Sequence, residues 1–459
     1  MSNETRMKRR DFLKALAGST LALNFPGWTA PAVATLNSEN SPLLLCFNAR
    51  GGWDPTIHCD PHAHPLYTYF SASSIAETST GIAYAPQRHS SWPGDESQEV
   101  DEHYMVSTSG APVRFFEKYA HDLLVINGID AQTVSHDVGS RNTWSGSTRE
   151  GHPAIGALIA SIYGPTQPLS FLTTGGFDAT AGLLTATRSG NIDALLPLIH
   201  PYTHRAELDN LVPLPTQALI AQAQAARIQR QLAGTGLPRR REIMNKLDFL
   251  RSQETGMEPL LAKLNEIQAL TIPEPVGNSL NEHIQLTVAG MMAGLTTSGQ
   301  FMISGFDTHQ DHFDMEDGQR SRLRALFEAQ DYAAELLKAV GLYQRATFMM
   351  GSDFGRTRIN NDDELGKDHW SVTSMMLMGA GITGGRTVGR TIILDDEEKG
   401  VAASLLDPET LLPSDNVDTG IYLSPAHIHK ALREALGTTA DPTAQEFAFS
   451  DVQLLPLLG

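Results

Sequence analysis

The sequence has little cysteine, few basic residues and no long apolar run. Its 459 residues include 2 cysteines, and 34 lysines and arginines stand against 52 aspartates and glutamates, for a formal net charge of −18. This acidic balance argues against nucleic-acid binding, because phosphates demand a basic protein surface. No apolar stretch reaches the roughly 20 residues that a membrane-spanning helix needs. The composition therefore favours a globular protein without a transmembrane segment.

The two cysteines give little support to a redox protein. Cys46 lies inside the apolar run Leu43–Phe47, which predicts a buried strand, where cysteine behaves as a small hydrophobe. An oxidising compartment would permit a disulfide between Cys46 and Cys59, and the sequence leaves that pairing open. The chain also lacks the glycine fingerprint of dinucleotide binding.

The first 34 residues have the layout of an export signal. The segment Lys8–Lys14, KRRDFLK, matches the twin-arginine consensus at every position after the first. A short apolar stretch from Ala15 to Phe25 follows, and Ala32–Ala34 supplies a small-x-small cleavage site. We therefore expect the twin-arginine export machinery to recognise residues 1–34. The folded remainder, residues 35–459, would then work in the periplasm or another extracytoplasmic space.

Short apolar runs alternate with helical periodicity along the remaining chain. From Arg320 to Val340 the apolar residues recur every three or four positions, which predicts an amphipathic helix. Residues 205–272, with an alanine- and glutamine-rich part and a Gly-Thr-Gly-Leu-Pro break at 234–238, predict a helical insertion or cap. Strand–helix–strand order predicts an α/β fold with a mostly parallel sheet covered by helices. Five apolar runs predict its buried strands: Leu43–Ala49, Leu123–Asn127, Phe301–Ser304, Thr347–Met350 and Met375–Met378.

Polar motifs follow several of these runs. They are GGWD at 51–54, SHD at 135–137, TWSG at 143–146, GFDTH at 305–309, GSDFGRT at 351–357 and GKDH at 366–369. In open α/β sheets the functional residues gather beyond the carboxyl ends of the strands, so these side chains can converge. Mixed aspartate and histidine sets bind Zn²⁺ or similar ions, which activate water or polarise an ester oxygen. The alternative for any single aspartate is a turn former or helix cap.

These motifs, in this order and behind a twin-arginine signal, resemble the exported bacterial family called domain of unknown function 1501. The resemblance runs from about Leu43 to the terminal helix. That family is grouped by fold with the alkaline phosphatase and sulfatase superfamily, and no established activity comes with it. The resemblance implies an alkaline phosphatase-like α/β/α sandwich with a mostly parallel central sheet. It also implies one or two divalent ions (Zn, Ca or Mg) held by Asp54, Asp307, His309, Asp353 and His369.

The sequence departs from the superfamily pattern in two places. Phe354 stands where the superfamily has a histidine after the third aspartate. The superfamily's usual spacing after Asp307 would also suit Asp311 or His312 better than His309.

Further residues are candidates for catalysis. Arg356 is placed either to pair bidentately with a phosphate or sulfate ester or to form a structural bridge to a nearby carboxylate. Thr143, Ser145 and Ser135 are candidate nucleophiles, and none has a distinctive context. Two hypotheses follow: a metal-dependent hydrolase of small phosphate or sulfate esters, or a degenerate, non-catalytic relative that binds a ligand or partner outside the cytoplasm.

Overall fold

The computed structural model describes most of the chain that follows the expected export signal. All described residues lie in the compact unit Leu36–Gly459, and the signal at 1–34 lies outside them, as do residues 205–211. Within the described part of the chain, no helix is both long and apolar enough to cross a membrane. The described residues are 41–62, 75–85, 104–106, 112–188, 212–234, 236–251, 258–275, 277–314, 317–358, 361, 366–394 and 400–459.

An eight-stranded sheet lies at the centre, in the order β14-β6-β13-β10-β1-β9-β7-β8. Neighbouring strands pair in parallel except that β13 is antiparallel to both β10 and β6. All five predicted strands belong to this sheet, and the prediction of a mostly parallel sheet is confirmed. The strands are β1 (Leu43–Ala49), β6 (Leu123–Asp130), β7 (Phe171–Thr173), β8 (Thr187–Arg188), β9 (Ser298–Ile303), β10 (Ala346–Ser352), β13 (Val372–Gly379) and β14 (Arg386–Val388).

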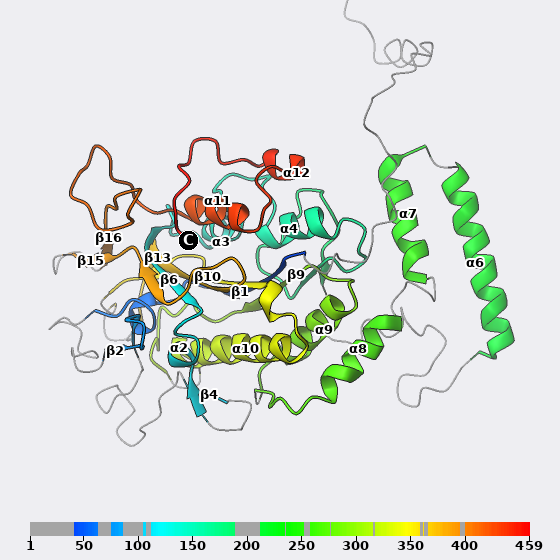
Figure 1. Ribbon diagram of the computed structural model, residues 1–459, viewed down its shortest axis with the longest axis horizontal. Helices are drawn as coiled ribbons and strands as arrows, with labels where there is room; N and C mark the ends of the chain where they lie inside the picture. Colours follow the sequence, from blue (N-terminus) through cyan, green and yellow to red (C-terminus); the bar gives the residue numbers. More distant parts are fainter. Residues whose placement is uncertain are drawn as a thin grey trace, which may run out of the picture. The chain divides into compact units, whose positions relative to one another are not determined.

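Helices cover both faces of the sheet (Figure 1). Alternate side chains of β1 point to opposite faces: Leu45 and Phe47 pack in one apolar cluster, and Leu44 and Cys46 pack in another. The predicted α/β/α sandwich is therefore confirmed, and α10 coincides with the predicted amphipathic helix. One layer contains α2 (Phe115–Lys118), α9 (Asn281–Met292) and α10 (Gln319–Ala339), and the other contains α3 (His136–Ser145), α4 (Ile155–Tyr163) and α11 (Pro425–Ala435).

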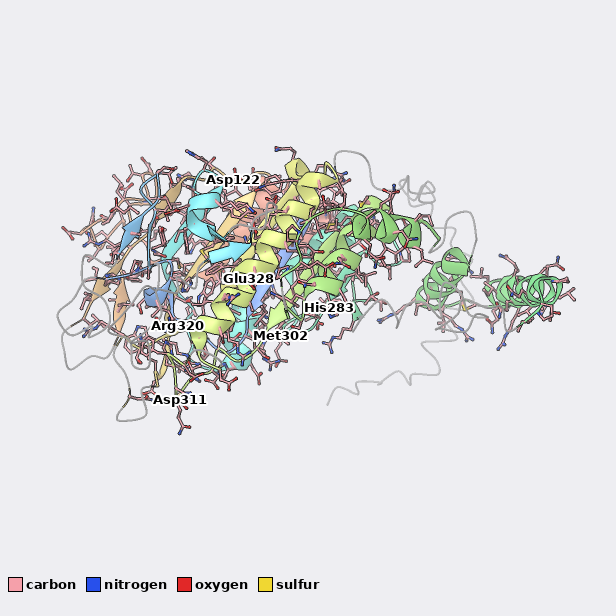
Figure 2. The ribbon with its side chains drawn as sticks, turned by 90° about the horizontal axis from the view of Figure 1, so that it is seen from below. Asp122, His283, Met302, Asp311, Arg320 and Glu328 are labelled. Atoms are coloured by element: carbon pink, nitrogen blue, oxygen red, sulfur yellow. The ribbon has the colours of Figure 1, made fainter. Side chains whose placement is uncertain are left out.

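Three helices occupy the described part of the predicted insertion, namely α6 (Leu214–Gly234), α7 (Pro238–Arg251) and α8 (Glu258–Gln268). Helix α6 ends at a glycine and α7 begins at a proline, which suits the first turn of a helix because its missing N–H would be unpaired there anyway. Helix α6 contacts α7, and α8 contacts α9. Figure 2 looks from below, with His283 labelled on α9 and with Arg320 and Glu328 labelled on α10.

Smaller elements complete the described fold. Four two-stranded sheets and three short helices lie outside the central sheet. They are β2 (Ala76–Glu77) with β3 (Ala83–Tyr84), β4 (Tyr104–Val106) with β5 (Pro112–Arg114), β11 (Gly355–Arg356) with β12 (His369–Trp370), β15 (Thr391–Ile393) with β16 (Val401–Ala403), η1 (Pro55–Ile57), η4 (Tyr343–Arg345) and α12 (Pro442–Gln445).

The two cysteines are free and lie in different apolar clusters. Cys46 packs with the α3, α4 and α11 layer, whereas Cys59 packs with the α9 and α10 layer. Burial raises the pKa of both thiols above the ordinary value. Both side chains therefore behave as small buried hydrophobes.

The polar motifs meet because of strand direction. Strands β1, β9 and β10 are parallel and in register, so that Ala49 lies opposite both Ile303 and Ser352. The loops that follow these strands start at one edge of the sheet. Strand β13 runs the opposite way, so its first residue, Val372, lies toward this same edge. The residues just before Val372 therefore join the loops that follow β1, β9 and β10.

Candidate metal centre

Three histidines surround one carboxylate at this edge. Asp307 and His309 follow β9, His136 opens α3, and His369 lies in β12 just before β13. The Nε2 atoms of His136, His309 and His369 lie 3.3, 3.2 and 3.1 Å from the carboxylate oxygens of Asp307. The Nε2 atoms of His309 and His369 are 3.0 Å apart. We call these four residues the His-Asp cluster.

The spacing within the His-Asp cluster suits a single ion. Zn²⁺ bonds to nitrogen and oxygen at about 2.0–2.1 Å, so tetrahedral ligand atoms lie roughly 3.3–3.4 Å from one another. The contacts to Asp307 are close to that separation. One ligand atom each from His136, Asp307 and His369 lies within 4.8 Å of the other two. Nitrogen and carboxylate donors in this arrangement fit a divalent ion.

The other ring nitrogen of each histidine has an acceptor. His369 Nδ1 lies 2.8 Å from the carbonyl oxygen of Val134, His136 Nδ1 lies 2.9 Å from Asp353 Oδ2, and His309 Nδ1 lies 3.2 Å from Asp368 Oδ1. A carbonyl oxygen accepts only, so a His369 that binds an ion through Nε2 would carry its proton on Nδ1. Asp353 and Asp368 can accept the Nδ1 protons of His136 and His309 in the same way. Histidines that bind metals usually have such a partner on the second nitrogen.

Electrostatics keep Asp307 ionised. Burial alone would raise the pKa of Asp307, but hydrogen bonds from Arg356 and His369 and the charge of Arg356 lower this pKa well below its ordinary value. The hydrogen bond to Asp353 raises the pKa of His136. About half of the Asp307 and His309 side chains is exposed, at 46% each. Water and a small ligand can therefore reach the His-Asp cluster.

Arg356 holds three loops together and is almost fully buried. Its Nε donates to Gly52 O at 2.9 Å, Nη1 donates to Lys367 O at 2.9 Å, and Nη2 donates to Asp307 Oδ1 at 2.7 Å and to Phe306 O at 3.0 Å. Its Nη2 also contacts Gly51 O. This arrangement corresponds to the structural-bridge interpretation. Few of its N–H groups remain for an ester oxyanion.

Asp353 and Asp54 lie apart from the exposed cluster. Asp353 is buried, and its Oδ2 accepts from His136 Nδ1 and from Gly51 N at 3.1 Å, so it supports His136 from behind. Asp54 is buried with Lys367 and His312. Of the five predicted metal residues, Asp307, His309 and His369 thus meet directly, Asp353 is one contact removed, and Asp54 belongs to a second cluster.

His136 is the cluster member that the sequence did not single out as a ligand. Its motif was noted, but a histidine at a helix start carries no spacing signal for metal binding. Phe354, where the resemblance implied a histidine, packs its ring against His136 and His369 with centroids 4.8 and 4.4 Å apart. A Cβ on Gly52, whose φ is +87°, would lie 2.6 Å from that ring, so glycine is needed there.

Two of the three candidate nucleophiles are hydrogen-bonded to backbone carbonyls, and the third, Ser135, is exposed and directly precedes His136. Thr143 and Ser145 are buried, and their hydroxyls donate to the carbonyls of Ser352 and Arg141 at 2.7 Å each. Thr143 follows His136 by seven helical residues, a rise of about 10 Å. Of the two alternatives by spacing, Asp311 is exposed and Figure 2 shows it at the lower edge of the molecule, whereas His312 is buried beside Asp54.

The fold and the His-Asp cluster define an α/β protein with a candidate divalent-metal centre at the edge of its central sheet. Residues 290–407 match the family described as "Protein of unknown function (DUF1501)". The match confirms the resemblance to this family over a segment that contains Asp307, His309, Asp353, Arg356 and His369.

Solved structures of the alkaline phosphatase and sulfatase type are similar to this chain at low identity. The alkaline phosphatase from the Antarctic bacterium TAB5 is 9% identical, with a TM-score of 0.30 over 74% of this chain and 92% of that one. A protein of the alkaline phosphatase superfamily from Vibrio parahaemolyticus is 9% identical, with a TM-score of 0.31 over 96% and 97%. A 2-O GAG sulfatase is 8% identical, with a TM-score of 0.30 over 86% and 71%. No curated protein gives a significant match.

Proposed function

We propose that the protein is a metal-dependent hydrolase of small phosphate or sulfate esters. A divalent ion would be held by His136, Asp307 and His369, with His309 beside them. The observation that supports this proposal is the convergence of three imidazole Nε2 atoms on one carboxylate at 3.1–3.3 Å. Nitrogen donors suit Zn²⁺ better than Ca²⁺ or Mg²⁺, which prefer oxygen ligands. When bound, such an ion polarises an ester oxygen and activates water.

The protein's own residues would orient the ligands and leave room for the ester. The partners of the three Nδ1 atoms would accept the imidazole protons when Nε2 binds an ion, and Arg356 holds Asp307 by a hydrogen bond. Phe354 covers two of the imidazole rings on its side of the cluster. The ester would approach from the exposed side, past Asp307 and His309.

Metal content and turnover test the proposal together. We expect natively produced protein to contain stoichiometric divalent metal and to hydrolyse 4-nitrophenyl phosphate or sulfate. Chelation should abolish that turnover, and Zn²⁺ should restore it. Native protein that contains no metal and takes up no Zn²⁺ would refute the proposal.

The second candidate function is a degenerate relative that binds a ligand or partner without catalysis. It is favoured by the hydroxyls of Thr143 and Ser145, which are buried and donate to backbone carbonyls. Metal binding without turnover of any aryl ester would support this candidate against the hydrolase.

We also propose that residues 1–34 direct export by the twin-arginine route. Replacing both Arg9 and Arg10 by lysine should leave the protein in the cytoplasm, because the route recognises the arginine pair. Cell fractionation and immunoblotting measure the result, and Arg6→Lys is the matched control. Unchanged export of the double variant would contradict this assignment.

A further inference from the structure

We infer that Lys367 is the built-in cation of a second site, so that the described residues bind one divalent ion and not two. This inference rests on the proposed function, because it assumes that the His-Asp cluster binds the first ion. The resemblance implied one or two ions and placed Asp54 among their ligands. The surroundings of Asp54 do not fit a metal ion.

The ammonium group of Lys367 lies where a metal ion bound to the Asp54 carboxylate would have to lie. Lys367 Nζ lies 2.5 Å from Asp54 Oδ2 and 3.4 Å from Thr56 Oγ1. His312 Nε2 lies 3.0 Å from the same Asp54 oxygen. Asp54 and His312 are fully buried, and Lys367 is 2% exposed. A carboxylate and a hydroxyl thus contact a cation that the chain itself supplies, and an imidazole contacts the same carboxylate oxygen.

The hydrogen bonds of this buried cluster are accounted for without a metal. Asp54 Oδ1 accepts from the N–H and the hydroxyl of Thr56 at 3.0 and 2.6 Å. His312 Nδ1 lies 2.8 Å from the hydroxyl of Thr308. A buried carboxylate needs a compensating cation, and the lysine meets that need. A second divalent ion would have to displace the ammonium from the same oxygen.

The buried pair also ties the metal centre to the core. The backbone of Lys367 donates its N–H to Thr308 O at 3.0 Å and accepts from Arg356 Nη1. The next two residues, Asp368 and His369, contact His309. Lys367 is therefore a positioning residue, because its anchoring in the core holds the segment that supplies two groups of the centre.

Metal stoichiometry tests the inference directly. Metal-free full-length protein would be titrated with Zn²⁺ by isothermal calorimetry, and bound zinc would be counted by atomic emission after gel filtration. We expect one ion in the wild type. Two ions would overturn the inference while leaving the proposed centre intact. Zero ions would overturn the proposed centre, and the inference with it.

Substitution of Lys367 provides a second test of the inference. Lys367→Met removes the built-in cation, so we expect the stoichiometry to rise from one to two. In Lys367→Met/Asp54→Asn the carboxylate is also neutralised, so one ion is expected. Lys118→Met, which breaks a lysine–aspartate pair with Asp331 elsewhere, is the matched control and should also bind one.

A folded Lys367→Met variant that still binds one ion would contradict the inference. Circular dichroism, with and without Zn²⁺, reports whether the variant folds. A variant that folds only with Zn²⁺ supports the inference, because the metal then replaces the missing cation. If the variant does not fold in either condition, the wild-type count decides, with one ion supporting the inference and two overturning it.

Discussion

Asp307→Asn is expected to lower the affinity of the protein for Zn²⁺ by about 100-fold or more. Asp307 is the residue that all three Nε2 atoms approach, and it is held ionised by Arg356. Asparagine keeps the shape but removes the negative charge, which leaves the Arg356 cation unopposed beside the ion. Mutation of an outer-shell partner typically lowers metal affinity by about 10- to 100-fold. Loss of a direct ligand should lower it by at least as much.

Competition with a chelating dye at fixed pH measures that affinity. Asp311→Asn is the control, because this exposed aspartate lies in the same loop outside the His-Asp cluster, and it should match the wild type. Asp353→Asn should fall between the two, because Asp353 contacts His136 Nδ1 and is not itself placed as a ligand. If Asp307→Asn binds Zn²⁺ as tightly as Asp311→Asn does, Asp307 is not a ligand.

Much of the fold could be predicted because buried parallel strands leave a local signature. The apolar runs that became β1, β6, β9, β10 and β13 are continuous, as expected for strands covered on both faces. Parallel strands end at the same edge of a sheet. Because Asp307 and Asp353 each come soon after such a strand, both could be predicted to lie at that edge. The reversal of β13 could not be predicted, because a buried apolar run does not indicate its own direction.

The residues that contact each site residue could not be predicted from the sequence. Asp54 and Lys367 are 313 residues apart, and nothing local shows that a lysine beside an aspartate and a histidine will turn into the core. For Arg356, the choice between ester binding and a structural bridge depends on which carbonyl oxygens the guanidinium contacts, and the sequence does not show this. His136 became a cluster member only because α3 starts next to the loop that follows β9.

Two buried histidines should make the stability of the fold depend on pH below neutrality. His58 and His429 are fully buried, and each has one ring nitrogen without a hydrogen-bond partner among the described residues. The other nitrogen of His429 donates to Thr143 O at 2.8 Å. Burial lowers the pKa of His58 to about 4 and that of His429 to about 3.

Because the pKa values of both histidines are lowered in the folded state, the stability of the fold should decrease as the pH falls. The unfolded chain takes up a proton on each histidine near pH 6.5, whereas the native state resists protonation until about pH 4 or 3. Their contribution to stability is therefore complete above pH 6.5 and is lost progressively as the pH falls toward the folded values. As the pH falls, each histidine should lower the free energy of unfolding by up to about 1.4 kcal/mol per pH unit, or by about 2 kcal/mol between pH 6.5 and 5.

Urea unfolding at pH 8, 7, 6 and 5, in the presence of a chelator, measures this dependence without pH-dependent metal binding adding to it. His429→Asn should lower the free energy of unfolding at every pH, because it leaves a poorly filled site against α3. Below pH 6.5 its curve should fall less steeply than the wild-type curve, by about 1 kcal/mol per pH unit. The two curves should run parallel between pH 7 and 8, which is the internal control. Curves that stay parallel down to pH 5 would show that His429 takes up its proton as readily in the native state as in the unfolded chain.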